Sequence, residues 1–281
     1  YPANGLISGK NLTLDVNLML STQSWSAAEH TPGHIRVVGG DLTINGEGEI
    51  NGVGGNNYSI VIWADGGKVT INGGTYTATR TVGTNGASAL RNENGDKAAK
   101  VTVNGGTYTA TAGTDNIFDV KTGKLEITGG TFTYDGAVFA EDLATVTGGK
   151  FAKADGQVND VTACVSAGYA QLEDGSVVSA TDLPDLVKVG EETYKTVWES
   201  AAKAGAGQTL ILLADAQTAR TITLAEGVIL DLNGYTLEAG GVFSSDSQII
   251  DGAQAGLLKI PEGYATFNTI NSQLPLWDAT A

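Results

Sequence analysis

Apolar and polar residues alternate along several short segments of this chain, and each segment runs into glycine. The clearest copy is Val69–Thr77, with the sequence Val-Thr-Ile-Asn-Gly-Gly-Thr-Tyr-Thr. Near copies occupy 101–109, 125–133 and 144–152, and a degenerate copy occupies 42–46. Alternation with a period of two predicts a half-buried strand. The glycine pair predicts a bend, because glycine adopts backbone angles that other residues resist.

Each copy therefore predicts a strand, a bend and a second short strand with its aromatic residue inside. Successive copies lie 19 to 32 residues apart. Repeats of roughly 20 to 50 residues are typical of solenoids, propellers or arrays. The segments between copies show no helical periodicity, and each repeat has too few strands for a propeller blade. The pattern predicts an all-β protein built as a β-solenoid, with loops of variable length on one side.

Stacking the copies places like residues above one another, about 4.8 Å apart. We expect an aromatic column of Tyr76, Tyr108, Phe132 and Phe151. We expect an amide ladder at the bend, formed by Asn45, Asn72 and Asn104 and continued by Thr128 and Thr147. We also expect two apolar columns, formed by Val69, Val101, Leu125 and Ala144 and by Ile71, Val103, Ile127 and Val146.

The pattern changes after the segment 181–185, which is a candidate boundary. We predict a first module over 1–182 and a second module over 183–281. Between them, Cys164-Val165 and neighbouring apolar pairs predict short closing strands. In the second module, Thr193 is placed to cap a helix over 194–204, and strands are predicted to follow it. The segment Leu230–Asn233 repeats the pattern of 14–17, so this module opens like the first and is either complete or truncated.

The Asn/Thr-Gly-Gly-Thr-Tyr/Phe core resembles the rungs of right-handed parallel β-helix proteins of the pectate-lyase-like superfamily. It is similar in particular to the non-catalytic repeats of large surface proteins from gut-dwelling Gram-positive bacteria. The resemblance covers 41–156, and the segment 187–237 resembles the entry rungs of such proteins, where a short helix caps the coil. It implies a right-handed parallel β-helix. Lyases of the superfamily carry clustered calcium-binding aspartates and a catalytic arginine or lysine, and that set does not map onto any column here.

Charge and composition narrow the classes of partner. The 281 residues carry a formal net charge of −15, and charged residues make up only 17% of the chain. Nucleic acid is excluded as a partner because its backbone requires basic patches. No apolar run reaches the length of a membrane span. Cys164 is the only cysteine, so it forms no intrachain disulfide, and we expect a small buried residue rather than a nucleophile.

Candidate catalytic and metal-binding residues are few. Glu47 and Glu49 lie two apart on one strand face, which fits the separation of about 5–10 Å between glycosidase carboxyls, but a solvated acidic edge is the preferred interpretation. Arg36, Arg80 and Arg91 are considered for a lyase, with the last two placed in loops. Two further sets lack the spacing of a metal site: His30 and His34 on a loop, and the acidic residues Asp115, Asp119, Asp155 and Asp160, for which Ca²⁺ is the cation considered. We predict no catalytic residue, no metal site and no cofactor.

The candidate ligand surface consists of Trp25, Tyr58, Trp63, Glu47 and Glu49, because amphipathic aromatic residues recur at binding surfaces. We predict a non-catalytic structural and adhesive module of an extracellular or cell-surface bacterial protein. Its loops and one sheet face would bind a glycan or a host or cell-surface protein. The alternative is a polysaccharide lyase or glycoside hydrolase, or a phage tailspike-type depolymerase. The chain begins at Tyr1 rather than Met, and we expect a piece of a longer protein. The oligomeric state is left open.

Overall fold

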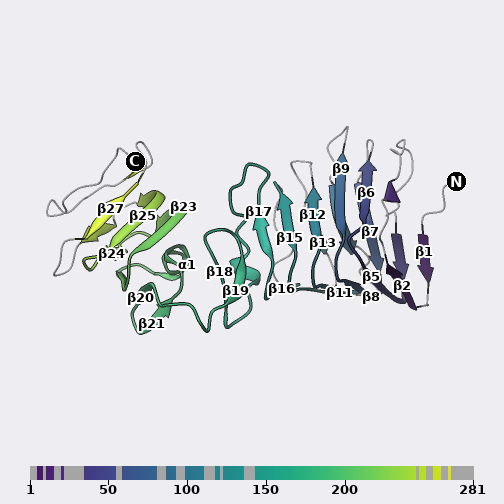
Figure 1. Cartoon of the computed structure of the whole chain (residues 1–281). Coiled ribbons are helices and arrows are strands. Elements are labelled where there is room, and N and C mark those ends of the chain that lie inside the picture. The colour runs from purple at the N-terminus through teal and green to yellow at the C-terminus, as the bar shows by residue number, and fades with distance from the viewer. Residues whose placement is uncertain are drawn as a thin grey trace. The chain divides into compact units, whose positions relative to one another are not determined.

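The fold is described from a computed structural model of the chain (Figure 1). The structure describes residues 5–8, 11–15, 20–21, 35–54, 59–80, 87–92, 99–110, 118–120, 123–135, 143–244, 247–250, 256–260 and 265–266. The chain divides into two compact units. Unit 1 comprises 1–169 with 174–178, and unit 2 comprises 170–173 with 179–281.

Unit 1 is built from three parallel sheets, and successive strands of the chain belong to different sheets. The first sheet contains β1 (Gly5–Ser8), β4 (Ile35–Val38), β7 (Ser59–Asp65), β10 (Ala87–Asn92) and β13 (Phe118–Val120). The second contains β2 (Asn11–Asp15), β5 (Asp41–Asn45), β8 (Gly67–Ile71), β11 (Ala99–Val103), β14 (Gly123–Ile127) and β16 (Ala144–Val146). The third contains β3 (Leu20–Ser21), β6 (Glu49–Gly54), β9 (Thr75–Arg80), β12 (Thr107–Ala110), β15 (Thr131–Tyr134) and β17 (Lys150–Ala152).

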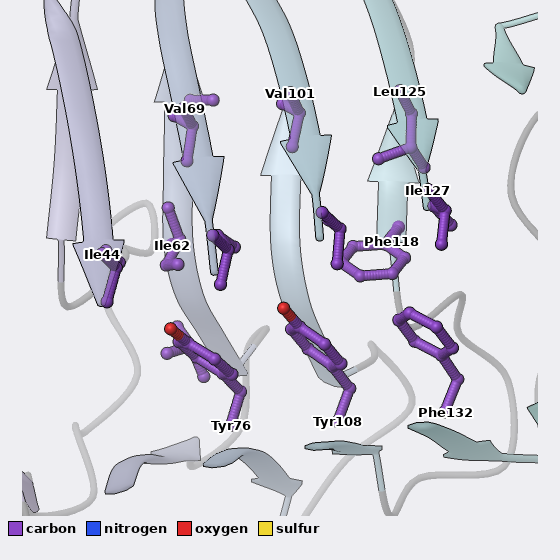
Figure 2. Packing of buried hydrophobic residues seen from close by; sticks show 14 of the residues in the cluster. Ile44, Ile62, Val69, Tyr76, Val101, Tyr108, Phe118, Leu125, Ile127 and Phe132 are labelled. Carbon is purple, nitrogen blue, oxygen red and sulfur yellow. The ribbon is translucent and has the colours of Figure 1, made fainter. Parts of the chain in front are cut away.

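Each strand of a sheet pairs with its counterpart in the next repeat, so the predicted columns are confirmed. Val69 pairs with Val101, and Val101 with Leu125. The aromatic column is buried and stacked, with ring centroids 4.9, 4.9 and 4.7 Å apart from Tyr76 to Phe151. Figure 2 shows the rings of Tyr76, Tyr108 and Phe132 lying in a row beside the aliphatic core. The all-β, parallel-sheet character predicted from the alternation is therefore confirmed.

The bend between the second and third sheets carries the predicted amide ladder. The Asn72 amide donates to Oδ1 of Asn45 at 2.7 Å, and the Asn104 amide donates to Oδ1 of Asn72 at 2.8 Å. Thr128 extends the ladder, because its hydroxyl donates to Oδ1 of Asn104 at 2.8 Å. The hydroxyl of Thr147 donates instead to the carbonyl of Ile127. The predicted ladder is confirmed as far as Thr128.

The segment after β17 differs from the predicted closing strands at one place. Cys164 lies in a 3-10 turn, η1 (Thr162–Cys164), and it is buried as expected. The strands β18 (Tyr169–Gln171) and β19 (Val177–Ser179) form a two-stranded sheet. The buried Asn159 amide donates to the carbonyls of Tyr134 and Ala152, at 2.7 and 2.8 Å, and so satisfies backbone groups at the ends of β15 and β17.

Unit 2 has a mixed sheet, a parallel sheet and one helix. The mixed sheet orders β21 (Glu192–Tyr194), β20 (Val187–Val189), β22 (Thr209–Leu212), β24 (Ile229–Asp231) and β26 (Gln248–Ile250), and β20 is antiparallel to both neighbours. The parallel sheet contains β23 (Ala216–Leu224), β25 (Thr236–Ser244), β27 (Leu257–Lys259) and β28 (Ala265–Thr266).

The helix α1 spans Val197–Lys203 and is shorter than predicted. Its N-cap position is Thr196, whereas Thr193 lies in β21 and pairs with Lys188. The predicted start of the helix was therefore wrong, because strand pairing competes for the residues ahead of it. The apolar side chains of the helix, including Val197 and Ala201, join the buried core of unit 2.

Candidate functional site

The outward face of the second sheet carries a row of three lysines. Lys68, Lys100 and Lys124 occupy the same register position on β8, β11 and β14. All three are exposed, and the residues that follow them, Val69, Val101 and Leu125, are buried. These lysines were not among the residues predicted from the sequence to form a site. The Lys-apolar-polar-apolar pattern ahead of three of the four Gly-Gly pairs of the repeats is the signal that could have found them.

The acidic neighbours of the row lie at its start and beside its middle. Asp41 on β5 pairs with Lys68. Glu126 on β14 pairs with Thr102 of β11, and its Oε1 lies 3.0 Å from Nζ of Lys100. The two side chains keep 51% and 37% of their area exposed, so this ion pair is solvated and contributes little to stability. The face therefore combines three cations with threonines and two carboxylates.

The backbone register of the first sheet brings Arg36, Trp63 and Arg91 together. Trp63 on β7 pairs with Arg36 on β4 and with Arg91 on β10, and Arg91 pairs with Asp119 on β13. Arg91 was predicted to lie in a loop, and this was wrong because Ala87–Asn92 forms a strand. Arg80 is the last residue of β9 and also lies in a strand. In the sequence, Trp63 and the arginines were considered separately. The 27 residues between Arg36 and Trp63 equal the separation of Asn45 and Asn72 in the repeats and could have shown this alignment. The 28 residues between Trp63 and Arg91 differ from the 32 between Asn72 and Asn104, so this second alignment could not be read from the repeats.

The carboxylates Glu47 and Glu49 are both exposed, at the turn before β6 and at its first residue. The Asn51 amide lies 3.5 Å from Oε2 of Glu49. Glu49 pairs across the third sheet with Thr75 of β9. This exposed setting agrees with the interpretation of a solvated acidic edge.

Several candidates lie outside the described residues: Trp25, His30, His34, Tyr58 and Asp115. Asp155 and Asp160 are exposed, and each accepts a backbone hydrogen bond from the residue two positions later, at 2.9 Å. Within the described part of the chain, no group of three or more His, Cys, Asp or Glu side chains is arranged to hold a metal ion.

Unit 2 contains a polar cluster that the sequence analysis missed. The Thr218 hydroxyl donates to Oε2 of Glu173 at 2.5 Å, and the guanidinium of Arg220 lies 4.0 Å from the centroid of the Trp198 ring. Burial raises the pKa of Glu173, while the hydrogen bond from Thr218 and the charge of Arg220 oppose that shift. Between Thr218 and Thr221 the register of β23 against β25 shifts. Such a shift cannot be read from alternation, so no sequence signal pointed to this cluster.

Comparisons with models of protein families, with curated proteins and with solved structures give no match. Among the residues that the structure describes, no helix has the length and apolar character needed to cross a bilayer.

Proposed function

We propose that this chain is a non-catalytic structural and adhesive module of an extracellular or cell-surface protein, built as a right-handed parallel β-helix. The observation that carries the proposal is the continuous in-register stacking of unit 1. Six strands pair in sequence in each of two parallel sheets, and like residues repeat from strand to strand. Stability then comes from interfaces between neighbouring repeats, so the repeat number sets the length of the module.

The stacking also explains how such a module would bind. Alternation buries one residue of each pair and leaves the next outside, so every outward position becomes a straight row. The threonine row of the second sheet is an example, formed by Thr43, Thr70, Thr102 and Thr145 and interrupted by Glu126. Long rows of uniform chemistry suit a repetitive ligand such as a glycan or an extended protein surface better than a small substrate, for which a concave pocket is typical.

The proposal is tested by measuring binding and turnover on an array of neutral and acidic polysaccharides, with and without Ca²⁺. We expect binding without release of new reducing or unsaturated ends. Turnover would contradict the proposal and favour the polysaccharide lyase or hydrolase. In that case Glu47→Gln and Glu49→Gln would be the first variants, with Asp155→Asn, an exposed carboxylate beyond the repeats, as the control. Absence of binding both to the array and to intact cells would remove the adhesive part of the proposal.

A further inference from the structure

The lysine row places three like charges on adjacent strands, which directs attention to a ligand. Lys68, Lys100 and Lys124 are direct neighbours across β8, β11 and β14, and adjacent strands lie about 4.8 Å apart. Like charges that face each other across a sheet are destabilising. The strands are held by their buried residues, such as Val69 and Val101, and do not need a lysine at this position.

The positive charge of the row is also unusual in a chain with a large excess of acidic residues. The formal net charge is −15, yet the two strand pairings within the row join lysine to lysine. Asp41 lies at one end of the row, beside Lys68. The carboxylate of Glu126, two positions after Lys124 on the same strand, forms an ion pair with Lys100. With one carboxylate at its end and one at its side, the row keeps a local excess of positive charge on an acidic molecule.

The first sheet places a second basic row close to the first in the chain. Arg36, Trp63 and Arg91 share one register position. Trp63 precedes Lys68 by only five positions in the chain, because β7 ends at Asp65 and β8 begins at Gly67. Two of the four arginines in the sequence and one of its four tryptophans therefore share one register position of the sheet. Asp119 ends this row on β13.

The residue types define the chemistry of the ligand. Arginine forms paired hydrogen bonds with planar or multi-oxygen anions such as carboxylate and sulfate, and lysine attracts them as a point charge. Because the basic residues recur at each strand spacing, the matching ligand is a polymer with anionic groups at regular intervals. The row carries one cation per strand spacing of about 4.8 Å, whereas duplex nucleic acid carries one charge per about 1.7 Å, so the spacing of the row does not match nucleic acid.

We infer that the lysine row of the second sheet binds an anionic polysaccharide that carries carboxylate or sulfate groups and runs along the direction of strand stacking. The inference rests on the proposed function and specifies its ligand. From the first to the third lysine, the row spans two strand spacings, about 10 Å. Contact with several residues of the polymer lets individually weak ion pairs act together.

The test is binding of the full chain to polygalacturonate, chondroitin sulfate, single-stranded DNA and neutral dextran at low and at high salt. The main variant is Lys68→Gln/Lys100→Gln/Lys124→Gln, whose side chains are exposed, so folding is retained. The matched control is Lys188→Gln/Lys203→Gln/Lys259→Gln, which removes the same charge from unit 2. A second variant, Arg36→Gln/Arg91→Gln, tests whether the register row of the first sheet contributes to the same binding. Polymer end groups are assayed in parallel.

We expect binding to at least one anionic polymer and none to dextran. The affinity should fall about tenfold in the lysine variant and remain unchanged in the control, since each exposed ion pair contributes a fraction of that effect. High salt should weaken binding, because exposed charges are screened. Preference for polygalacturonate would identify carboxylate as the recognised group, and preference for chondroitin sulfate would identify sulfate.

Three outcomes would overturn the inference. Equal affinity of the lysine variant and its control would mean that the row does not bind the polymer. Equal affinity for single-stranded DNA would make the surface a general polyanion site. Binding to dextran alone would leave the adhesive function standing and remove only the anionic ligand. Release of new polymer ends, by contrast, would contradict the proposed non-catalytic function itself, whichever polymer is bound.

Discussion

The ring of Tyr108 stacks on the ring of Tyr76 with centroids 4.9 Å apart and an interplanar angle of 8°. Each hydroxyl reaches back to its own bend: Tyr76 donates to the carbonyl of Gly73 at 2.9 Å, and Tyr108 donates to that of Gly105 at 2.8 Å. Burial raises the pKa of both phenols. One side chain thus packs the core and also satisfies a backbone carbonyl of its glycine pair.

The hydrogen bond of its hydroxyl distinguishes Tyr108 from Tyr134, although both side chains are buried. Tyr108→Phe removes a buried hydrogen bond and should lower the free energy of unfolding by about 1 kcal/mol. The buried hydroxyl of Tyr134 has no hydrogen-bond partner among the described residues, so Tyr134→Phe should leave stability unchanged or raise it. Urea unfolding followed by circular dichroism measures both. An equal loss in the two variants would show that the Gly105 bond contributes nothing.

The glycine pair at the bend gives a second prediction, on the stability of a variant at Gly106. Gly106 has a φ of +101°, and a Cβ there would lie 2.9 Å from the carbonyl oxygen of Gly74 and 3.1 Å from the hydroxyl of Tyr108. The carbonyl of Gly74 also accepts a hydrogen bond from the backbone N–H of Thr107 at 2.8 Å. Displacing this carbonyl therefore weakens the backbone pairing between the two bends. Gly106→Ala should therefore incur a backbone cost of about 1–2 kcal/mol and a further packing cost of about 1–3 kcal/mol.

Gly156→Ala is the matched control for this substitution. Gly156 has a φ of +87° and no atom within 4 Å of a built Cβ. It should therefore show the backbone cost alone. Thermal unfolding of both variants measures the difference, and equal losses at the two sites would contradict the packing contribution.

The repeats made the core of unit 1 predictable, because equivalent residues of successive repeats lie above one another in the structure and can be aligned in the sequence. Tyr76, Tyr108 and Phe132 are such a set. The strand β10 could not be predicted in the same way. Its sequence, Ala-Ser-Ala-Leu-Arg-Asn, has weak strand propensity, and its partners β7 and β13 supply the backbone hydrogen bonds that hold it. In unit 2, the antiparallel pairing of β20 has no counterpart in the repeats.

The amide ladder gives a third prediction, at Asn72. Its amide donates to Asn45 and its Oδ1 accepts from Asn104, so Asn72→Ala should lower the free energy of unfolding by about 1 kcal/mol. Asn72→Thr should lose less, because Thr128 occupies the equivalent ladder position and bonds to Asn104. Asn72→Asp should lose most, since it removes the donor and turns a carboxylate toward Oδ1 of Asn45.

Hydrogen exchange of the amides in 72–75 and 104–107 measures the effect locally, together with urea unfolding of the whole chain. We expect faster exchange in the alanine variant and slow exchange in the threonine variant. Equal exchange rates in the wild type and in Asn72→Ala would show that the backbone ladder alone holds the bend. Asn51→Ala, on the third sheet outside the ladder, is the control.

The candidate site was predicted only in part, for a physical reason. Trp63 was identified by its residue type, but its alignment with Arg91 depends on loops whose lengths differ between repeats. The lysine row was visible in the repeats, yet an exposed lysine on a strand is ordinary when it is seen alone. Only the pairing of Lys68, Lys100 and Lys124 across strands shows that their charges lie side by side.

The polar cluster of unit 2 predicts a dependence of stability on pH. Burial raises the pKa of Glu173 above its ordinary value of 4.5, despite the opposing hydrogen bond from Thr218 and the charge of Arg220. Between 4.5 and the raised pKa, the folded state binds more protons than the unfolded state, so the free energy of unfolding falls as the pH rises through this window. Below 4.5 both states are protonated and the contribution is fully present. Glu173→Gln should remove part of this slope, so its stability relative to the wild type should increase from pH 4 to pH 7.

Urea unfolding of the full chain at several pH values measures how the free energy of unfolding depends on pH in the wild type and in Glu173→Gln. Glu199 retains some dependence of the same sign in the variant, because burial raises its pKa too, against the charge of Lys203. Glu226→Gln, at an exposed position of the same unit, is the control and should follow the wild-type slope. If Glu173→Gln also followed the wild-type slope, the carboxyl would have to be equally solvated in the folded and unfolded states, and its hydrogen bond with Thr218 would have to be open in solution.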